Sequence, residues 1–189
     1  MITSCLNHLY RSQCLTYLER RTSAIYHYCD TLLQPLSDVQ SQCVREVGVD
    51  PAEAILHFPP APPQTRRDIS MFGLVRRAVR QNGPAHFRKC FEVAPTQPRR
   101  HTRAASRAHG YQVLDKRPAS YCAQARRSAL GLVPIYSMLP HDIPSIDDMS
   151  QFQKALQELA QIVAAAERPG WADVFSPRTP MHRHPLRMQ

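Results

Sequence analysis

The stretch MSQFQKALQELAQIV, residues 149–163, decides the fold class of this chain. Its apolar side chains recur at steps of three and four residues, at Met149, Phe152, Leu156, Leu159 and Val163. This spacing places them on one face of an α-helix, and Asp147 or Asp148 can cap its start. Because Pro169-Gly170 closes the pattern, we predict a helix near residues 148–167.

A second stretch, residues 31–47, has the same character. Its apolar residues fall at steps of four, three, four and four, at Leu32, Leu36, Val39, Cys43 and Val47. Gly48 follows, at the position where a helix commonly stops. We therefore predict a second amphipathic helix near residues 31–47.

Weaker patterns predict two more helices in the first third of the chain. Residues 4–28 carry apolar side chains near helical spacing and form one long helix or two short ones. Asp50-Pro51 combines a capping carboxylate with a proline at the first helical position, which predicts a short helix near 51–57. The predicted fold class is mainly α, as a small irregular helical domain.

The 189 residues are enough for one ordinary domain, and 17 prolines against 6 glycines predict irregular connections. We divide the chain into four segments. They are an N-terminal helical segment (1–94), a basic loop (95–127), a segment with an apolar box and the final helix (128–168), and an irregular C-terminal tail (169–189).

Basic residues outnumber acidic ones, with 24 Lys and Arg against 15 Asp and Glu and a net charge of +9. Most of the excess lies in residues 95–127, which hold eight Lys or Arg and a single acid, Asp115. Its few apolar anchors are Tyr111, Val113 and Leu114, so we predict a mobile, disordered loop or a marginal hairpin. The charge favours nucleic acid or another polyanion as a partner.

Ten arginines are candidates for contacts with phosphate groups, since a guanidinium pairs with phosphate through a planar fork. Thr65 can cap a helix near 65–81 that Asn82-Gly83-Pro84 breaks, and its arginines are expected mostly away from its apolar face. The helix carries Arg66, Arg67, Arg76, Arg77 and Arg80, and the basic loop carries Arg99, Arg100, Arg103, Arg126 and Arg127. The alternative is a solvated helix face and a disordered loop.

Catalytic and cofactor sites are not predicted. Two-metal nucleotidyl transfer needs converging carboxylates, and the only adjacent acidic pair, Asp147-Asp148, is better explained as a helix cap. The six glycines are scattered, so the sequence has no glycine-rich phosphate loop.

Metal binding is not predicted either. Six cysteines occur without a CxxC pair, and His27/Cys29 and His182/His184 each lack a second pair of ligands. We interpret the cysteines as free thiols and small buried hydrophobes, and the histidines as surface residues. The start of the chain does not resemble a signal peptide, and no stretch approaches the roughly 18 apolar residues of a membrane span. We expect an intracellular protein, in the nucleus or the cytoplasm.

Several short motifs occur in a fixed order. They are Leu36-Ser37-Asp38-Val39-Gln40, Arg66-Arg67-Asp68-Ile69, Phe72-Gly73-Leu74, Gly83-Pro84, Arg127-Ser128, Tyr136-Ser137-Met138-Leu139-Pro140 and Met149-Ser150-Gln151-Phe152. In this order and spacing they resemble the region downstream of the polymerase palm in non-LTR (LINE-type) retrotransposon reverse transcriptases, which are RNA-directed DNA polymerases. The segment Tyr136-Ser137-Met138-Leu139-Pro140, here called the Leu-Pro box, departs from the family at Tyr136 and Ser137, where many relatives have Trp and Asn.

The resemblance implies a non-catalytic fragment, because the palm with its metal-binding aspartates has no counterpart in this sequence. Residues 1–94 would then be the thumb-like and post-thumb part. The partners that it implies are RNA or DNA, bound through phosphates, and the remainder of a reverse transcriptase. The alternative is a small helical protein-interaction module without a nucleic-acid role, which would use the apolar faces at Val39 and Phe152.

Overall fold

The fold is mainly α in the computed structural model, which describes residues 8, 12, 22–48, 62–95, 109–115, 126–166 and 170–188. The helix expected near 51–57 lies outside these residues, as does most of the one expected over 4–28. From the latter the structure describes α3 (Thr22–Ile25), after which the chain turns before the next helix. The helices expected near 31–47, 65–81 and 148–167 are all present.

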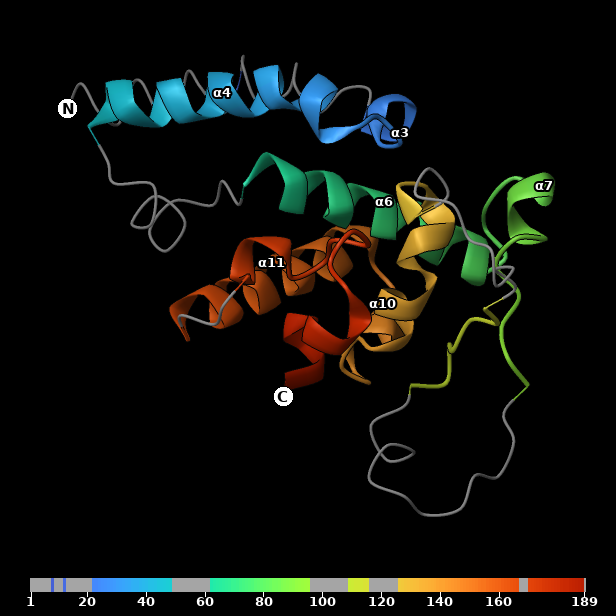
Figure 1. The fold of residues 1–189 in the computed structure, drawn as a ribbon. Coiled ribbons are helices and arrows are strands. Elements are labelled where there is room, and N and C mark those ends of the chain that lie inside the picture. The colour runs from blue at the N-terminus through green and yellow to red at the C-terminus, as the bar shows by residue number, and fades with distance from the viewer. Residues whose placement is uncertain are drawn as a thin grey trace.

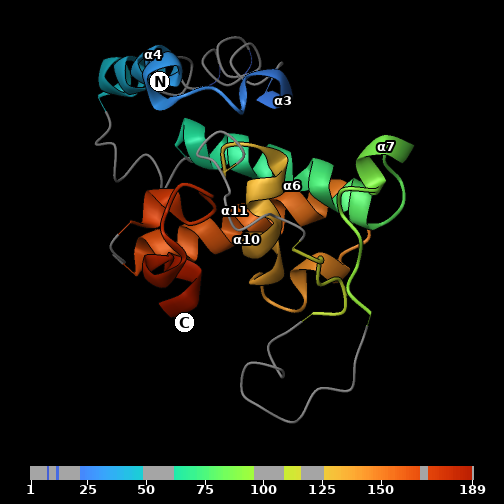
Figure 2. The same ribbon diagram turned by 45° about the vertical axis from the view of Figure 1, so that its right-hand side comes forward.

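The helix with the most buried residues is α6 (Pro63–Val79). Figures 1 and 2 show it between α3 and α4 (Asp30–Val47) on one side and α10 (Val133–Ser137) and α11 (Met149–Ala165) on the other. Covered from two sides, α6 buries eleven of its seventeen residues, among them Phe72 and Val75 at 0% exposure. It is therefore the centre of the hydrophobic core.

The start of α6 differs from the prediction. The helix begins at Pro63, so Thr65 is not its cap. The Thr65 side chain is buried and its hydroxyl donates a hydrogen bond to the carbonyl of Ala172, 2.8 Å away. At the other end Gln81 has a positive φ of 60°, and the chain leaves the helix before Gly83 and Pro84 as predicted.

Helix α11 agrees with the prediction closely. The carboxylate of Asp148 accepts a hydrogen bond from the backbone N–H of Gln151 at 2.8 Å, so the acidic residue caps the helix. The apolar stripe packs into the core through Phe152, Leu156, Leu159 and Val163. The helix ends at Ala165, two residues before the predicted end.

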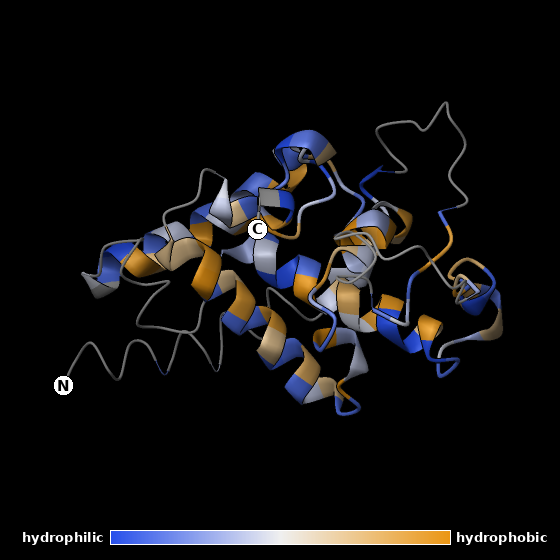
Figure 3. Cartoon of the chain, turned by 90° about the horizontal axis from the view of Figure 1, so that it is seen from below, coloured by the Kyte–Doolittle hydropathy of each residue, from blue (hydrophilic) through white to orange (hydrophobic). Residues whose placement is uncertain are grey.

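Helix α4 ends where the sequence indicates, since Gly48 adopts a left-handed φ of 72° and its N–H donates to the carbonyl of Arg45 at 2.9 Å. Its covered face differs from the predicted one. Leu33 and Gln40 are buried, whereas Leu32 and Val39 are exposed. Figure 3 shows hydrophobic and hydrophilic residues in alternating bands along the helices.

The basic loop (95–127) is fastened to the core just before its start and again at residues 112–113, in its middle. Val93 forms an isolated antiparallel bridge with Val113, and Ala94 N–H donates to Gln112 O at 2.7 Å. This pairing places residues 93–94 beside residues 112–114, and residues 96–108 between them lie outside the described residues, so the choice between a loop and a marginal hairpin stays a prediction. Between Pro84 and the bridge lies the short helix α7 (Ala85–Arg88).

The tail consists of turns and short 3₁₀-helices, η4 (Trp171–Asp173), η5 (Met181–Arg183) and η6 (Pro185–Met188). It is irregular, as predicted, yet it supplies Val174, Phe175 and Leu186 to the core. The Phe175 ring meets Phe72 edge to face, with centroids 5.5 Å apart. None of the described helices is both long and apolar enough to cross a bilayer.

Candidate nucleic-acid interface

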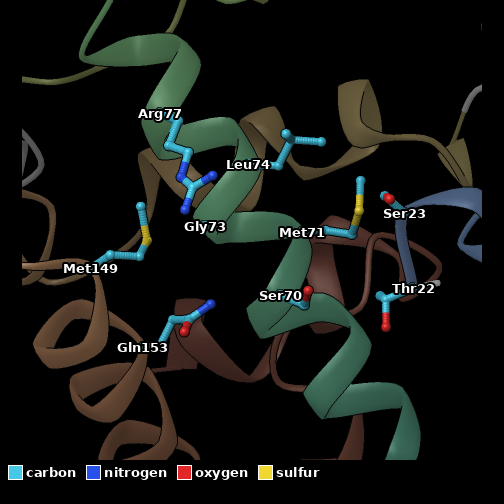
Figure 4. A pocket seen from close by; sticks show the side chains of 9 residues that line it. All are labelled: Thr22, Ser23, Ser70, Met71, Gly73, Leu74, Arg77, Met149 and Gln153. Carbon is cyan, nitrogen blue, oxygen red and sulfur yellow. The ribbon is translucent and has the colours of Figure 1, made fainter. Parts of the chain in front are cut away.

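A groove crosses α6 at Gly73, with α3 on one side and α11 on the other (Figure 4). Its volume is about 250 Å³. The lining residues are Thr22 and Ser23 from α3, Ser70, Met71, Gly73, Leu74 and Arg77 from α6, and Met149 and Gln153 from α11. The lining contains one cation, several hydroxyl and amide groups, and no acid.

Gly73 forms the floor of this groove because it has no side chain. A Cβ at this position would lie 3.1 Å from Nε2 of Gln153 and 3.3 Å from Sδ of Met149. The glycine thus lets two side chains of α11 approach the backbone of α6. The groove was not predicted, and the only signal for it in the sequence is a glycine inside an otherwise regular helix.

The five candidate arginines expected on this helix, four in α6 and Arg80 at its C-cap, do not share one environment. Arg77 is exposed, Arg66 and Arg80 are half-buried, and Arg67 and Arg76 are buried at 5% and 3% exposure. The expectation that the arginines lie away from the core is therefore wrong for Arg67 and Arg76. With neighbours on two sides, α6 has too little solvent-facing surface for all five.

Arg67 belongs to a buried polar cluster with Tyr26, Gln64 and Asp68. The Tyr26 hydroxyl and the Gln64 amide both donate to Oδ1 of Asp68, at 2.7 and 3.0 Å. Arg67 Nη2 donates to Oε1 of Gln64 at 3.2 Å. Burial raises the pKa of Asp68 to about 7 and lowers the pKa of Arg67. The cluster joins the turn after α3 to α6 and is structural.

Arg76 and Arg80 also make contacts within the fold. Their guanidinium carbons lie over aromatic rings, Arg76 at 4.8 Å from the centroid of Phe152 and Arg80 at 4.7 Å from that of Tyr111. Arg80 forms an ion pair with Asp147 and donates to the carbonyls of Pro144 (3.1 Å) and Ser145 (2.8 Å). Burial lowers the pKa of Arg76. Both side chains hold α6 to the elements around it.

Asp147 and Asp148, the adjacent acidic pair, each have a structural role. Asp148 caps α11, and Asp147 pairs with Arg80. Across the described residues, no three His, Cys, Asp or Glu side chains gather in a group that could hold a metal ion.

The remaining candidate arginines belong to the basic loop. Arg126 is exposed and Arg127 is half-buried, just before the 3₁₀-helix η2 (Ala129–Leu132). Arg99, Arg100 and Arg103 lie outside the described residues. The structure therefore describes seven of the ten candidates, and the groove is lined by only one of them, Arg77.

The Leu-Pro box anchors residues 109–112 in the middle of the basic loop. His109 Nε2 donates to the carbonyl of Tyr136 at 2.9 Å, and Gln112 Nε2 donates to that of Ser137 at 3.0 Å. Tyr136 is itself buried at 0% exposure, and burial raises its pKa to about 12. Residues 109–115 are thereby held against α10.

Two expectations about histidines and cysteines are wrong. His109 and His184 are buried, at 3% and 0% exposure, rather than on the surface. Burial lowers the pKa of His184 to about 4, because the charged imidazolium would be desolvated. The cysteines described are free thiols as predicted, but Cys90 is exposed rather than buried.

Comparison of the chain with protein-family models, with curated protein sequences and with solved structures found no match. The resemblance to reverse transcriptases thus rests on the sequence motifs alone and remains a prediction.

Proposed function

We propose that this chain is a non-catalytic helical module, related to the C-terminal region of non-LTR retrotransposon reverse transcriptases, that binds RNA or DNA through phosphate groups without base specificity. The observation that carries the proposal is the distribution of charge. Residues 95–127 hold eight Lys or Arg and one Asp, out of a net charge of +9 for the whole chain. Such a concentration attracts the phosphate backbone.

The way in which this loop is held supports the proposal. The Val93–Val113 bridge and the two bonds to the Leu-Pro box fasten it to a packed helical core. Three other arginines already have partners within the fold. Arg67 donates to Gln64, Arg76 lies over the Phe152 ring and Arg80 pairs with Asp147. Phosphate contacts are therefore assigned to the loop arginines and to Arg77.

A catalytic role is not part of the proposal. Metal-assisted phosphoryl transfer requires carboxylates that converge on metal ions. Asp148 and Asp147, the only adjacent acidic pair of the sequence, are used as a helix cap and as a partner of Arg80.

The test is binding of the purified chain to labelled single-stranded RNA and to duplex DNA over a series of salt concentrations. Replacing Arg99, Arg100 and Arg103 by Ala should weaken RNA binding. It should also flatten the plot of log affinity against log salt by about 2, since each lost contact with a single strand removes about 0.7. Replacing Lys89, Arg183 and Arg187, three exposed basic residues outside the loop, removes the same charge as a control. No binding at low salt, or equal losses in both variants, would refute the proposal.

A second candidate is a protein-interaction module. It is favoured by α4, on which Leu32 is 62% exposed and Val39 is 44% exposed. The other face expected for this role is not available, because Phe152 is buried in the core. Sedimentation of the chain at rising concentration tests self-association through α4, which Leu32→Glu should abolish.

A further inference from the structure

The groove at Gly73 is small and lies on the surface of α6. It lies between two helices that flank α6, as Figure 4 shows with Thr22 and Ser23 on one side and Gln153 and Met149 on the other. Its 250 Å³ is smaller than the typical site for a drug-sized ligand. A space of this size suits one nucleotide unit of a flexible strand better than a rigid duplex about 20 Å across.

The polar groups that line the groove suit an anion. Arg77 is exposed, and its side chain bends back along α6 toward Gly73 (Figure 4). Ser70 lies two turns earlier on the same helix, and Gln153 brings its amide from α11 to the floor of the groove. A guanidinium with neighbouring hydroxyl and amide donors, and no carboxylate in the lining, favours a phosphate oxygen over a cation.

The apolar part of the lining suits the rest of a nucleotide. Met71, Leu74 and Met149 line the groove beside the polar groups. Thioether side chains are flexible and polarisable, and they pack against rings without demanding one shape. Such a surface accepts any base or sugar and reads no hydrogen-bonding pattern.

Arg77 differs from Arg76 and from Arg80, the residue that follows the last turn of α6. Arg76 lies over Phe152, and Arg80 is paired with Asp147 and two carbonyls. Arg77 lies between them in the sequence but projects into the groove instead. The helix thus directs one guanidinium to a solvent-accessible space and uses its neighbours for packing.

We propose that this groove binds one phosphodiester group of a single-stranded nucleic acid, with Arg77 pairing the phosphate and with Ser70 and Gln153 as further donors. The inference rests on the proposed function and adds a defined subsite to it. The strand would pass over α6 at Gly73 as well as along the basic loop. The site recognises the backbone, so it accepts RNA and DNA strands alike.

The test measures affinity for labelled 12-nucleotide single strands, one of RNA and one of DNA, with a duplex of the same sequence as a third probe. Arg77→Ala should weaken binding of both single strands about tenfold, the loss of one charged hydrogen bond, and flatten the salt dependence by about 0.7. Arg183→Ala removes the same charge from an exposed position outside the groove and should change affinity less than twofold. Duplex affinity should be the same for Arg77→Ala and Arg183→Ala.

A second variant tests the groove without changing the charge. Ser70 is exposed on α6, so Ser70→Leu should leave the fold intact while filling part of the groove. We expect it to weaken single-strand binding at least fivefold. In a two-dimensional NMR spectrum of the wild-type chain, the side-chain amide of Gln153 should shift when the RNA strand is added. This measurement uses the wild-type chain, so it tests the groove even if a variant fails to fold.

The outcomes separate the two proposals. If the wild-type chain binds strands and the loop variant loses binding, but Arg77→Ala matches Arg183→Ala and the Gln153 amide does not shift, the groove is not a subsite and the proposed function stands. If the wild-type chain binds no strand at low salt, both proposals fall. A loss in Arg77→Ala and Ser70→Leu together with a shift of the Gln153 amide supports the groove.

Discussion

Helices α4 and α11 are nearly equal in length and have apolar residues at the same helical spacing, yet they are used differently. In α11 the predicted stripe is the buried face, with Phe152 and Leu156 at 0% exposure. In α4 the predicted stripe is partly solvent-exposed, and Leu33 and Gln40 face the core instead. Apolar spacing predicts that a helix forms, but the neighbouring elements decide which face is covered.

The difference follows from what surrounds each helix. Helix α11 contacts α6 and the 3₁₀-helices η3 (Ile143–Ser145) and η4, so its stripe is covered from several directions. Helix α4 contacts α6 and lies on the outside of the molecule (Figures 1 and 2). The substitutions below test this contrast and the burial of the tail, from the largest expected effect to the smallest.

Phe152→Ala should lower the free energy of unfolding by about 3–5 kcal/mol, because it leaves a cavity at the centre of the core. Urea denaturation followed by circular dichroism measures the loss. Ile162→Ala is the control on the same helix, at a position that is 65% exposed, and should have little effect. Similar losses for both variants would contradict the burial of the α11 stripe.

Acid should destabilise the packing of the tail against the core, because protonation puts a charge on the buried His184. The pKa of this buried histidine is lowered from its ordinary 6.5 to about 4, so the folded state favours the neutral ring. The stabilisation of the folded state by the neutral His184 ring is fully present above pH 6.5 and is lost as the pH falls toward 4. The loss in the free energy of unfolding amounts to at most about 3 kcal/mol.

The measurement for His184 is the stability of wild type against His184→Gln between pH 7 and pH 4. The wild-type chain should lose more stability over this window than the variant. Asp68 has the opposite pH dependence and is present in both proteins. Its pKa is raised to about 7, so the stabilisation by its protonated form decreases as the pH rises from about 4 to 7. Parallel curves for the two proteins would show that His184 does not control the tail.

Asp148→Ala should lower stability by about 1 kcal/mol, because it removes the cap of α11. Helix α4 begins after Cys29, which makes no capping hydrogen bond with its side chain, so Cys29→Ser should stabilise the chain by a few tenths to about 1 kcal/mol. Thermal melting measures both changes. A loss of stability in Cys29→Ser would mean that the thiol packs in a way that a hydroxyl does not tolerate.

Leu32→Ala should change stability by less than about 0.5 kcal/mol, since the side chain is 62% exposed. Urea denaturation at two protein concentrations measures it. A loss above 1 kcal/mol that depends on concentration would show that another copy of the chain covers this face in solution.

Local signals predicted the long helices correctly. The steps of three and four residues, the cap at Asp148 and the stop at Gly48 act within one or two turns of a helix, so the sequence shows them directly. Predictions about side-chain exposure were less successful, because exposure depends on partners. Arg76 and Arg77 are adjacent in the sequence, yet one packs on Phe152 and the other lines the groove.

The sequence by itself determined that the chain is mainly α, where the helices of residues 30–47 and 149–165 lie, and that the positive charge is concentrated between residues 95 and 127. Only the tertiary structure decided the groove at Gly73, the covered face of α4 and the packing of the tail, where Arg178 reaches the carbonyl of Tyr28 across 150 residues. The physical reason is that helix formation depends on neighbours within a few residues, whereas burial depends on contacts between segments far apart in the chain.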